Sequence, residues 1–166
     1  TFIYTGQVFT QRTTNANTLN KLPILLMIYI TRRLEFCASH RLFNPAFSDE
    51  KNAATFGLCN NPNGHGHNYV LEVTVKGEVD PETGMVLDLK SLKKLINEEI
   101  VDKVDHKNLN VDVEFLKNVI PTAENIAIHF WDIIEPKIEN GTLHEIKLFE
   151  SERNFVIYRG TELERP

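Results

Sequence analysis

The stretch from residue 59 to residue 69 reads CNNPNGHGHNY, and the rest of the chain is best interpreted outward from it. Its first half is rich in Asn, Pro and Gly, which favour turns. From His67 onward apolar and polar residues alternate, which is typical of a strand. Side chains of a strand return to the same face at every second residue, so His65 and His67 are expected side by side. Gly66 between them leaves room for a metal ion close to the backbone.

A third imidazole comes from a second alternating run. Residues 34–40 read LEFCASH, and every second residue up to His40 would lie on one apolar face. If this strand pairs with the strand that begins at His65, three histidines meet at the end of that face. Three protein ligands with one open position are typical of catalytic zinc, whereas structural zinc takes four. A chance His-X-His motif is the alternative.

The composition favours one globular domain and excludes several classes of function. The chain has 166 residues, of which 42% are hydrophobic and 25% are charged, and these values are ordinary for a soluble domain. The net charge of −5 argues against a general nucleic-acid-binding protein. No apolar run reaches membrane-spanning length. Cys37 and Cys59 are too few for a disulfide framework, which favours a reducing compartment.

The first residues differ in composition from the rest. Residues 1–34 contain no Asp or Glu, which resembles an organellar transit segment. We therefore predict an N-terminal extension at residues 1–27, a folded domain at residues 28–160 and a polar tail at residues 161–166. A cytoplasmic location is expected, and mitochondrial or other organellar targeting by the extension is the alternative.

The order of the predicted elements defines the fold class. Strands are predicted at residues 28–40, 65–77, 143–150 and 154–158, and helices are predicted to begin after the N-cap residues Asp88 and Thr122. The order strand, strand, helix, helix, strand, strand indicates an α+β domain, a four-stranded antiparallel sheet with both helices on one face. Edge strands need partners, and sheets of several copies that join into a barrel would supply them.

The long connection at residues 41–64 is expected to be functional because it carries Cys59, with a short helical turn at residues 48–52. Cys59 is the candidate nucleophile or base, since a thiol near a metal loses its proton easily; a fourth structural zinc ligand is the alternative. Asp105 and His106 could form a relay that activates this thiol, or His106 could simply satisfy a helix end. Cys37 lies on the face opposite His40 and is expected to be a buried small residue.

Glu150 continues the apolar face of the strand at residues 143–150, so its side chain is expected to point toward the core. A carboxylate there must pair with a donor or bind a ligand, and a salt bridge to Arg153 or Lys147 is the alternative. Thr122 and Glu124 could reach the same region from their helix start, or could only cap the helix.

These features together resemble the 6-pyruvoyl-tetrahydropterin synthase family over residues 28–160. The composite is far more specific than any one motif. The residues that carry the resemblance are Ala38-Ser39-His40-Arg41, Phe56-Gly57, Cys59 to Tyr69, Gly77 to Pro81, Thr83 to Val86, Asp105 to Leu109, Thr122 with Glu124-Asn125, and Glu150. Cys37 stands where the family often has a small hydroxyl residue, a departure that the fold should tolerate.

The resemblance implies the tunnelling fold, with sheets joined into oligomeric barrels and trimers stacked as a homohexamer. The implied substrate is 7,8-dihydroneopterin triphosphate and the products are 6-pyruvoyl-tetrahydropterin and triphosphate, on the path to tetrahydrobiopterin. This reaction is that of a carbon–oxygen lyase acting on phosphates. The implied roles are Zn²⁺ ligands at His40, His65 and His67, a general base with its relay at Cys59, Asp105 and His106, and a pterin anchor at Glu150 (also counted as catalytic), Thr122 and Glu124.

Several points stay open at the level of sequence. Arg41, Lys51 and Lys107 are candidate cations for the triphosphate. A 6-carboxy-tetrahydropterin synthase of deazapurine biosynthesis is the nearest alternative, although its cysteine tends to lie closer to the His-Gly-His motif. An enzyme that cleaves a related pterin by aldol chemistry and a non-catalytic zinc-binding protein are further alternatives.

Overall fold

Two long strands form the centre of the sheet in the computed structural model, which describes residues 27–160. β1 (Ile28–His40) and β2 (His65–Gly77) are antiparallel and pair along their whole length. The register places Ile28 opposite Gly77 at one end and His40 opposite His65 at the other. Both strands and their pairing match the sequence prediction. Most of the predicted extension, residues 1–26, and the predicted tail at residues 161–166 lie outside the described residues.

The sheet has five strands in the order β3-β1-β2-β4-β5. β4 (Thr142–Phe149) is antiparallel to β2, and β5 (Phe155–Tyr158) is antiparallel to β4, as predicted. The prediction of four strands, all antiparallel, was wrong in one respect. β3 (Lys107–Asn108) is a short additional strand that runs parallel to the end of β1, opposite Ala38 and Ser39. A strand of two residues is too short to produce an alternating pattern, so its sequence reads as a loop.

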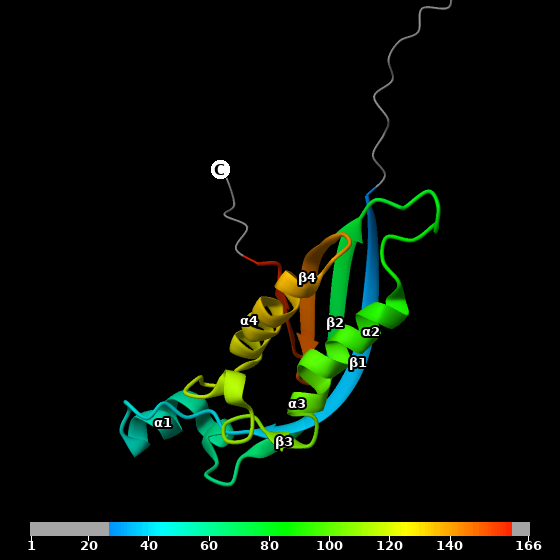
Figure 1. Cartoon of the computed structure of the whole chain (residues 1–166). Coiled ribbons are helices and arrows are strands. Elements are labelled where there is room, and N and C mark those ends of the chain that lie inside the picture. Colours follow the sequence, from blue (N-terminus) through cyan, green and yellow to red (C-terminus); the bar gives the residue numbers. More distant parts are fainter. Residues whose placement is uncertain (1–26, 161–166) are drawn as a thin grey trace, which may run out of the picture.

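The helices begin where their caps predict. The Asp88 carboxylate accepts from the Lys90 N–H at the start of α2 (Leu89–Ile96), and the Thr122 hydroxyl oxygen accepts from the Asn125 N–H at the start of α4 (Ala123–Ile134). A π-helical turn (Asn97–Val101) continues α2 into α3 (Asp102–Val104). These helices cover one face of the sheet (Figure 1).

The connection between β1 and β2 contains more helix than predicted. α1 (Asp49–Phe56) and the 3₁₀ helix Gly57–Asn60 occupy its second half, where the sequence indicated only a short turn. α1 lies beyond the end of the sheet that carries β3 (Figure 1). Two further 3₁₀ turns, Glu114–Leu116 and Glu135–Lys137, flank α4.

The core lies between the sheet and the helices that cover it. The fully buried large side chains come from both layers: Tyr69, Leu71, Ile146 and Leu148 of the sheet, and Leu92, Ile96, Ile100, Ile126, Phe130 and Ile134 of the helical layer. The expectation for Cys37 was wrong, because its side chain is exposed. It lies on the polar face of β1, which no helix covers. Among the described residues, no helix is long and apolar enough to cross a membrane.

Candidate functional site

Three imidazoles meet where β1 ends and β2 begins. His40 is the last residue of β1 and lies opposite His65, while His67 lies opposite Ala38. Their nearest ring nitrogens all lie within 4.8 Å of one another, and the Nε2 atoms of His40 and His65 are 3.1 Å apart. The turn before His65 needs Gly64, which has a φ of 73° and whose missing Cβ would lie 3.0 Å from the His40 carbonyl oxygen.

The donor set fits a metal ion. The Pro121 carbonyl oxygen can only accept, so the His40 Nδ1 at 2.8 Å carries the proton, and its Nε2 presents a lone pair to the cluster. A second Nε2 at 3.1 Å is close to the separation of about 3.3 Å between two nitrogens of a tetrahedral zinc site. The Nε2 of His67 is buried and has no hydrogen-bond partner among residues 27–160. A bound cation would satisfy all of these lone pairs.

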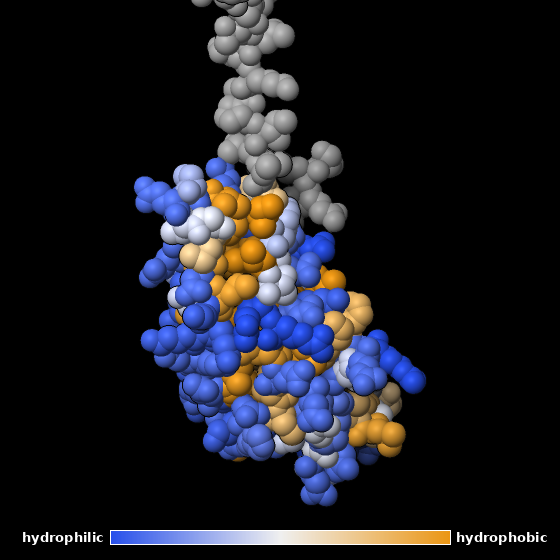
Figure 2. Space-filling view, turned by 90° about the vertical axis from the view of Figure 1, so that its right-hand side faces the viewer, coloured by the Kyte–Doolittle hydropathy of each residue, from blue (hydrophilic) through white to orange (hydrophobic). Residues whose placement is uncertain are grey.

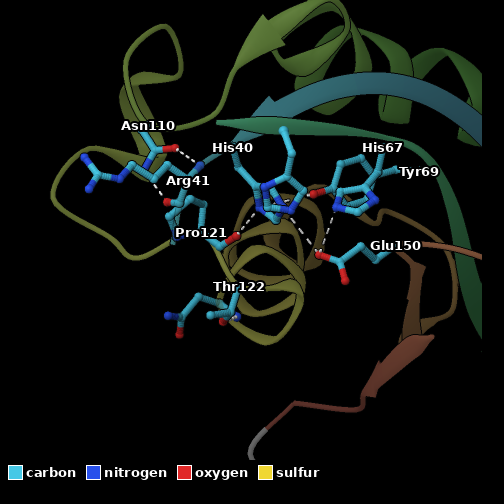
Figure 3. Close-up of polar contacts among 10 residues, drawn as sticks. His40, Arg41, His67, Tyr69, Asn110, Pro121, Thr122 and Glu150 are labelled. Carbon is cyan, nitrogen blue, oxygen red and sulfur yellow. Dashed lines mark hydrogen bonds and ion pairs between the residues drawn. The ribbon is translucent and has the colours of Figure 1, made fainter. Parts of the chain in front are cut away.

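Burial keeps the histidines in the form that binds a metal. Desolvation lowers the pKa of His40 and of His67, so that both rings are neutral at neutral pH. The Glu150 carboxylate opposes this effect in part, since its Oε1 lies 3.5 Å from the His40 Nε2 and 3.7 Å from the His67 Nε2. Burial also raises the pKa of Tyr69, whose hydroxyl lies 3.4 Å from the His40 Nδ1. Figure 3 shows Glu150 directed toward the histidines.

A cavity of about 530 Å³ adjoins this cluster and brings together the three residues predicted to bind substrate. Thr122, Glu124 and Glu150 line it, together with Leu42, Phe56, Ala123, Arg153, Asn154, Phe155 and Val156. Its volume is in the usual range for small-molecule sites. The alternative of a salt bridge from Glu150 finds no support among the described contacts. The Lys147 ammonium lies over the rings of Phe149 and Phe155.

Asp105 and His106 form a pair at the end of β1. The Asp105 Oδ2 lies 3.0 Å from the His106 Nδ1, and its Oδ1 accepts from the Cys37 N–H at 2.8 Å. That backbone hydrogen bond, with a smaller contribution from His106, lowers the pKa of Asp105. The side chain of His106 is 82% exposed, and its φ of 57° is unusual for a residue other than glycine.

Cys59 lies in the 3₁₀ helix Gly57–Asn60 and is half-buried. Its carbonyl oxygen accepts from the Leu42 N–H at 2.9 Å, which ties the thiol-bearing segment to the residues just after His40. Within residues 27–160, Cys59 makes no hydrogen bond to Asp105 or His106. One chain therefore assembles the histidine cluster and the Asp–His pair, but it does not join the pair to the thiol.

Two contributors to the cluster were not predicted as site residues. Tyr69 shares the strand face of His67, and the same alternation that indicated the histidines could have indicated it. The Pro121 carbonyl approaches His40 from 81 positions along the chain and is a backbone group, so no side-chain pattern identifies it.

Comparison with known proteins gives one consistent result. The family model for 6-pyruvoyl tetrahydropterin synthase matches residues 29–161. Human 6-pyruvoyl tetrahydrobiopterin synthase is 49% identical over 131 residues, which cover 79% of this chain and 90% of the human protein. The solved structure of 6-pyruvoyl tetrahydropterin synthase from Caenorhabditis elegans matches with a TM-score of 0.78 at 43% identity, covering 82% of this chain and 98% of the other.

A more distant relative comes from the nearest alternative group. The 6-carboxy-5,6,7,8-tetrahydropterin synthase of Rickettsia typhi is 34% identical over 149 residues, covering 78% of this chain and 99% of the bacterial protein. Identity is thus clearly higher to the proteins named for the pyruvoyl product. On these matches and on the shared fold, the chain belongs to the 6-pyruvoyl tetrahydropterin synthase family.

Proposed function

We propose that this chain is a zinc-dependent 6-pyruvoyl-tetrahydropterin synthase that converts 7,8-dihydroneopterin triphosphate to 6-pyruvoyl-tetrahydropterin and triphosphate, a carbon–oxygen lyase of tetrahydrobiopterin biosynthesis. One observation carries the proposal: a three-histidine cluster lies against Glu150 at the edge of a cavity that Thr122 and Glu124 also line. Relatives that carry this name, at identities up to 49%, support it.

His40, His65 and His67 would hold the Zn²⁺, and the hydrogen bond from the His40 Nδ1 to the Pro121 carbonyl would fix that ring in the ligating tautomer. Bound zinc would polarise oxygen atoms of the substrate side chain and acidify the adjacent C–H bonds. Imidazole is a ligand that zinc shares with other transition metals, so zinc is our assignment within that group.

Glu150 and the start of α4 would hold the pterin ring. A carboxylate accepts two hydrogen bonds at once and so suits the amidine edge of a pterin. The Thr122 hydroxyl oxygen already accepts from the Asn125 N–H, so its hydroxyl proton remains available for a ring acceptor. Glu124 lies in the first turn of α4 and lines the same cavity.

Cys59 would act as the general base that takes a carbon-bound proton from the substrate side chain. Protons move from side-chain carbons to the ring imine, which is reduced internally, and triphosphate leaves by elimination. The reaction therefore needs no external oxidant or reductant. Asp105 would orient His106 through Nδ1 and leave the exposed Nε2 to accept the thiol proton.

This relay would be completed between copies of the chain, since His106 is exposed and not bonded to its own Cys59. The sheet offers an edge for such assembly. Among the described residues, β3 covers β1 only at Ala38 and Ser39. Figure 2 shows a band of apolar side chains on the side that carries β1 and α2, and Ile28, Tyr29 and Leu89 of these elements are exposed. A homohexamer of joined sheets, a dimer of trimers, would cover them.

We also propose the domain division given by the sequence, with the catalytic domain at residues 28–160 between an extension and a tail. The proposed compartment is the cytoplasm, and organellar targeting by the extension is the alternative. The proposed small-molecule partner is the pterin triphosphate. Neither nucleic acid nor a membrane is a proposed partner, because the net charge is −5 and the substrate cavity opens in a globular domain.

Product identity tests this function. The zinc-loaded protein would be incubated with 7,8-dihydroneopterin triphosphate, and the pterin identified by mass spectrometry. We expect a 6-pyruvoyl product with release of triphosphate. A 6-carboxy product would move the chain to the group of the Rickettsia relative. Absence of turnover with zinc bound would leave a non-catalytic metal-binding protein.

A further inference from the structure

Arg41 follows the metal-ligand candidate His40 directly, but its guanidinium points away from the histidine cluster (Figure 3). It binds Asn60 instead. The Arg41 Nε donates to the Asn60 carbonyl oxygen at 3.0 Å and to the Asn60 Oδ1 at 3.2 Å, and Nη2 donates to the same Oδ1 at 2.9 Å. The guanidinium carbon also lies 4.4 Å from the centre of the Phe43 ring. The cation is therefore engaged by the chain itself.

The main chain of Arg41 is held from the other side. Its N–H donates to the Asn110 Oδ1 at 2.8 Å, and its carbonyl oxygen accepts from the Asn110 Nδ2 at 2.9 Å. The next residue, Leu42, donates its N–H to the Cys59 carbonyl. Residues 41 and 42 thus connect the end of β1 to both Cys59 and Asn60, while Asn110 fixes Arg41 to the loop that follows β3.

Few apolar contacts hold the segment that carries Cys59. Asn52 is the one buried residue of α1, and Leu58, the neighbour of Cys59, is 95% exposed. A segment with so little buried surface is placed mainly by its polar contacts. The planar fork of arginine can grip a carbonyl and an amide oxygen together, whereas a lysine ammonium is a point charge without that geometry.

We infer that Arg41 is a positioning residue that holds Cys59 in place through Asn60, and that it is not a cation for the substrate's triphosphate. The inference rests on the role proposed for Cys59. It assigns to Arg41 a function that acts on the rate of the chemical step, because a displaced base loses its approach to the substrate carbon without weakening substrate binding.

Arg41→Lys separates the two roles, because lysine keeps the charge and loses the fork. We expect kcat to fall about 100-fold, KM to stay nearly constant and the metal content to stay unchanged. Asn60→Ala, which removes the Oδ1 acceptor, should lower kcat in the same direction, and the double variant should be little worse than the worse single variant. Arg159→Lys is the matched control, since Arg159 binds Glu145 through Nε and Nη2 outside the proposed site.

A second measurement needs no substrate. Iodoacetamide labels both cysteines, and peptide mass spectrometry reports each rate, with the exposed Cys37 as a reference within the same molecule. The ratio of Cys59 to Cys37 labelling should rise severalfold in Arg41→Lys and stay constant in Arg159→Lys. If Arg41→Lys does not fold, Asn60→Ala is judged on the same ratio.

Two outcomes would overturn the inference. One is a raised KM for the triphosphate substrate with kcat intact in Arg41→Lys, which would make Arg41 a phosphate cation. The other is a labelling ratio that none of these substitutions changes. If the unaltered protein does not turn over the substrate, the proposed function fails, and the labelling ratio alone decides whether Arg41 holds Cys59.

Discussion

The histidine cluster and the thiol region differ in how the fold supports them. His40, His65 and His67 lie on two paired strands, and the side chain of His40 is 1% exposed. Cys59 lies on a short 3₁₀ helix in a long connection, and His106 at the end of β1 is 82% exposed. The first group is complete in one chain, whereas the second is not.

The difference follows from the kind of contact that places each group. Strand register fixes three imidazoles together, because a shift by one residue would turn all of them to the other face of the sheet. The thiol and the Asp–His pair are placed by a few polar contacts of loops, so they depend on neighbouring segments and on assembly. The metal site should therefore survive changes that abolish the relay, while loss of the metal site should abolish activity altogether.

Removal of a histidine ligand is the strongest way to break this comparison. His40→Ala should lose the bound zinc and all activity, because two imidazoles are too few for a stable site. Metal analysis of the purified protein measures the loss, and circular dichroism checks that the variant is folded. His144→Ala is the control, since His144 packs against Tyr29 away from the cluster and its loss should leave the metal in place. Full metal content in a folded His40→Ala protein would refute the three-histidine site.

A mixing experiment sharpens the other half of the comparison. Cys59→Ala and His106→Ala should each retain zinc and lose about 10²- to 10⁴-fold in kcat, the usual contribution of a general base. If the relay joins two copies, chains of both variants co-expressed with different tags should form some sites with an intact thiol and an intact histidine. Activity of the mixed oligomer above that of either variant supports this arrangement. A mixture as inactive as its components would place the relay within one chain or abolish it.

The sequence predicted the parts that depend on regular patterns. The alternation of β1 and β2, with the turn residues at 60–64, was sufficient for both strands, their pairing and the meeting of three histidines. The cap residues Asp88 and Thr122 located both helix starts, because capping is a local interaction.

The remaining features depend on contacts that no local pattern contains. β3 is defined by hydrogen bonds from His106 and Leu109 to the end of β1. The burial of Cys37 was wrongly predicted, since alternation tells which face a residue occupies but not whether a helix covers that face. Arg41 was a candidate phosphate ligand by charge, whereas its partner Asn60 is chosen by the path of the connection.

Glu150 links the two regions, and its charge can be removed without changing its shape. Glu150→Gln should weaken binding of 7,8-dihydroneopterin triphosphate by about 10- to 100-fold, the usual effect of losing a hydrogen bond to a charged group. Calorimetry in a Cys59→Ala background measures binding without turnover, and metal analysis should show unchanged zinc. Glu152→Gln, in the exposed turn after Glu150, is the control. Equal affinity in both variants would remove Glu150 from the pterin site.

The smallest expected effect is the pH dependence of stability in the metal-free protein. Burial lowers the folded-state pKa of His40 and His67 below the ordinary value of 6.5, so the unfolded chain binds more protons than the folded chain just below that pH. The free energy of unfolding should therefore fall as the pH drops from about 7.5 to about 5.5. Asp105 does not interfere, because its lowered pKa makes its contribution fade only below its ordinary value of 3.8.

Urea denaturation at several pH values measures this slope in protein treated with a chelator. His40→Asn should flatten it, since the buried ring that resists protonation is gone, whereas His144→Gln should leave it intact. The same slope should appear in the zinc-loaded protein as metal release on acidification, because protons and metal compete for the same nitrogens. A slope that His40→Asn leaves unchanged would show that other groups carry it and that the cluster is protonated as readily as free histidine.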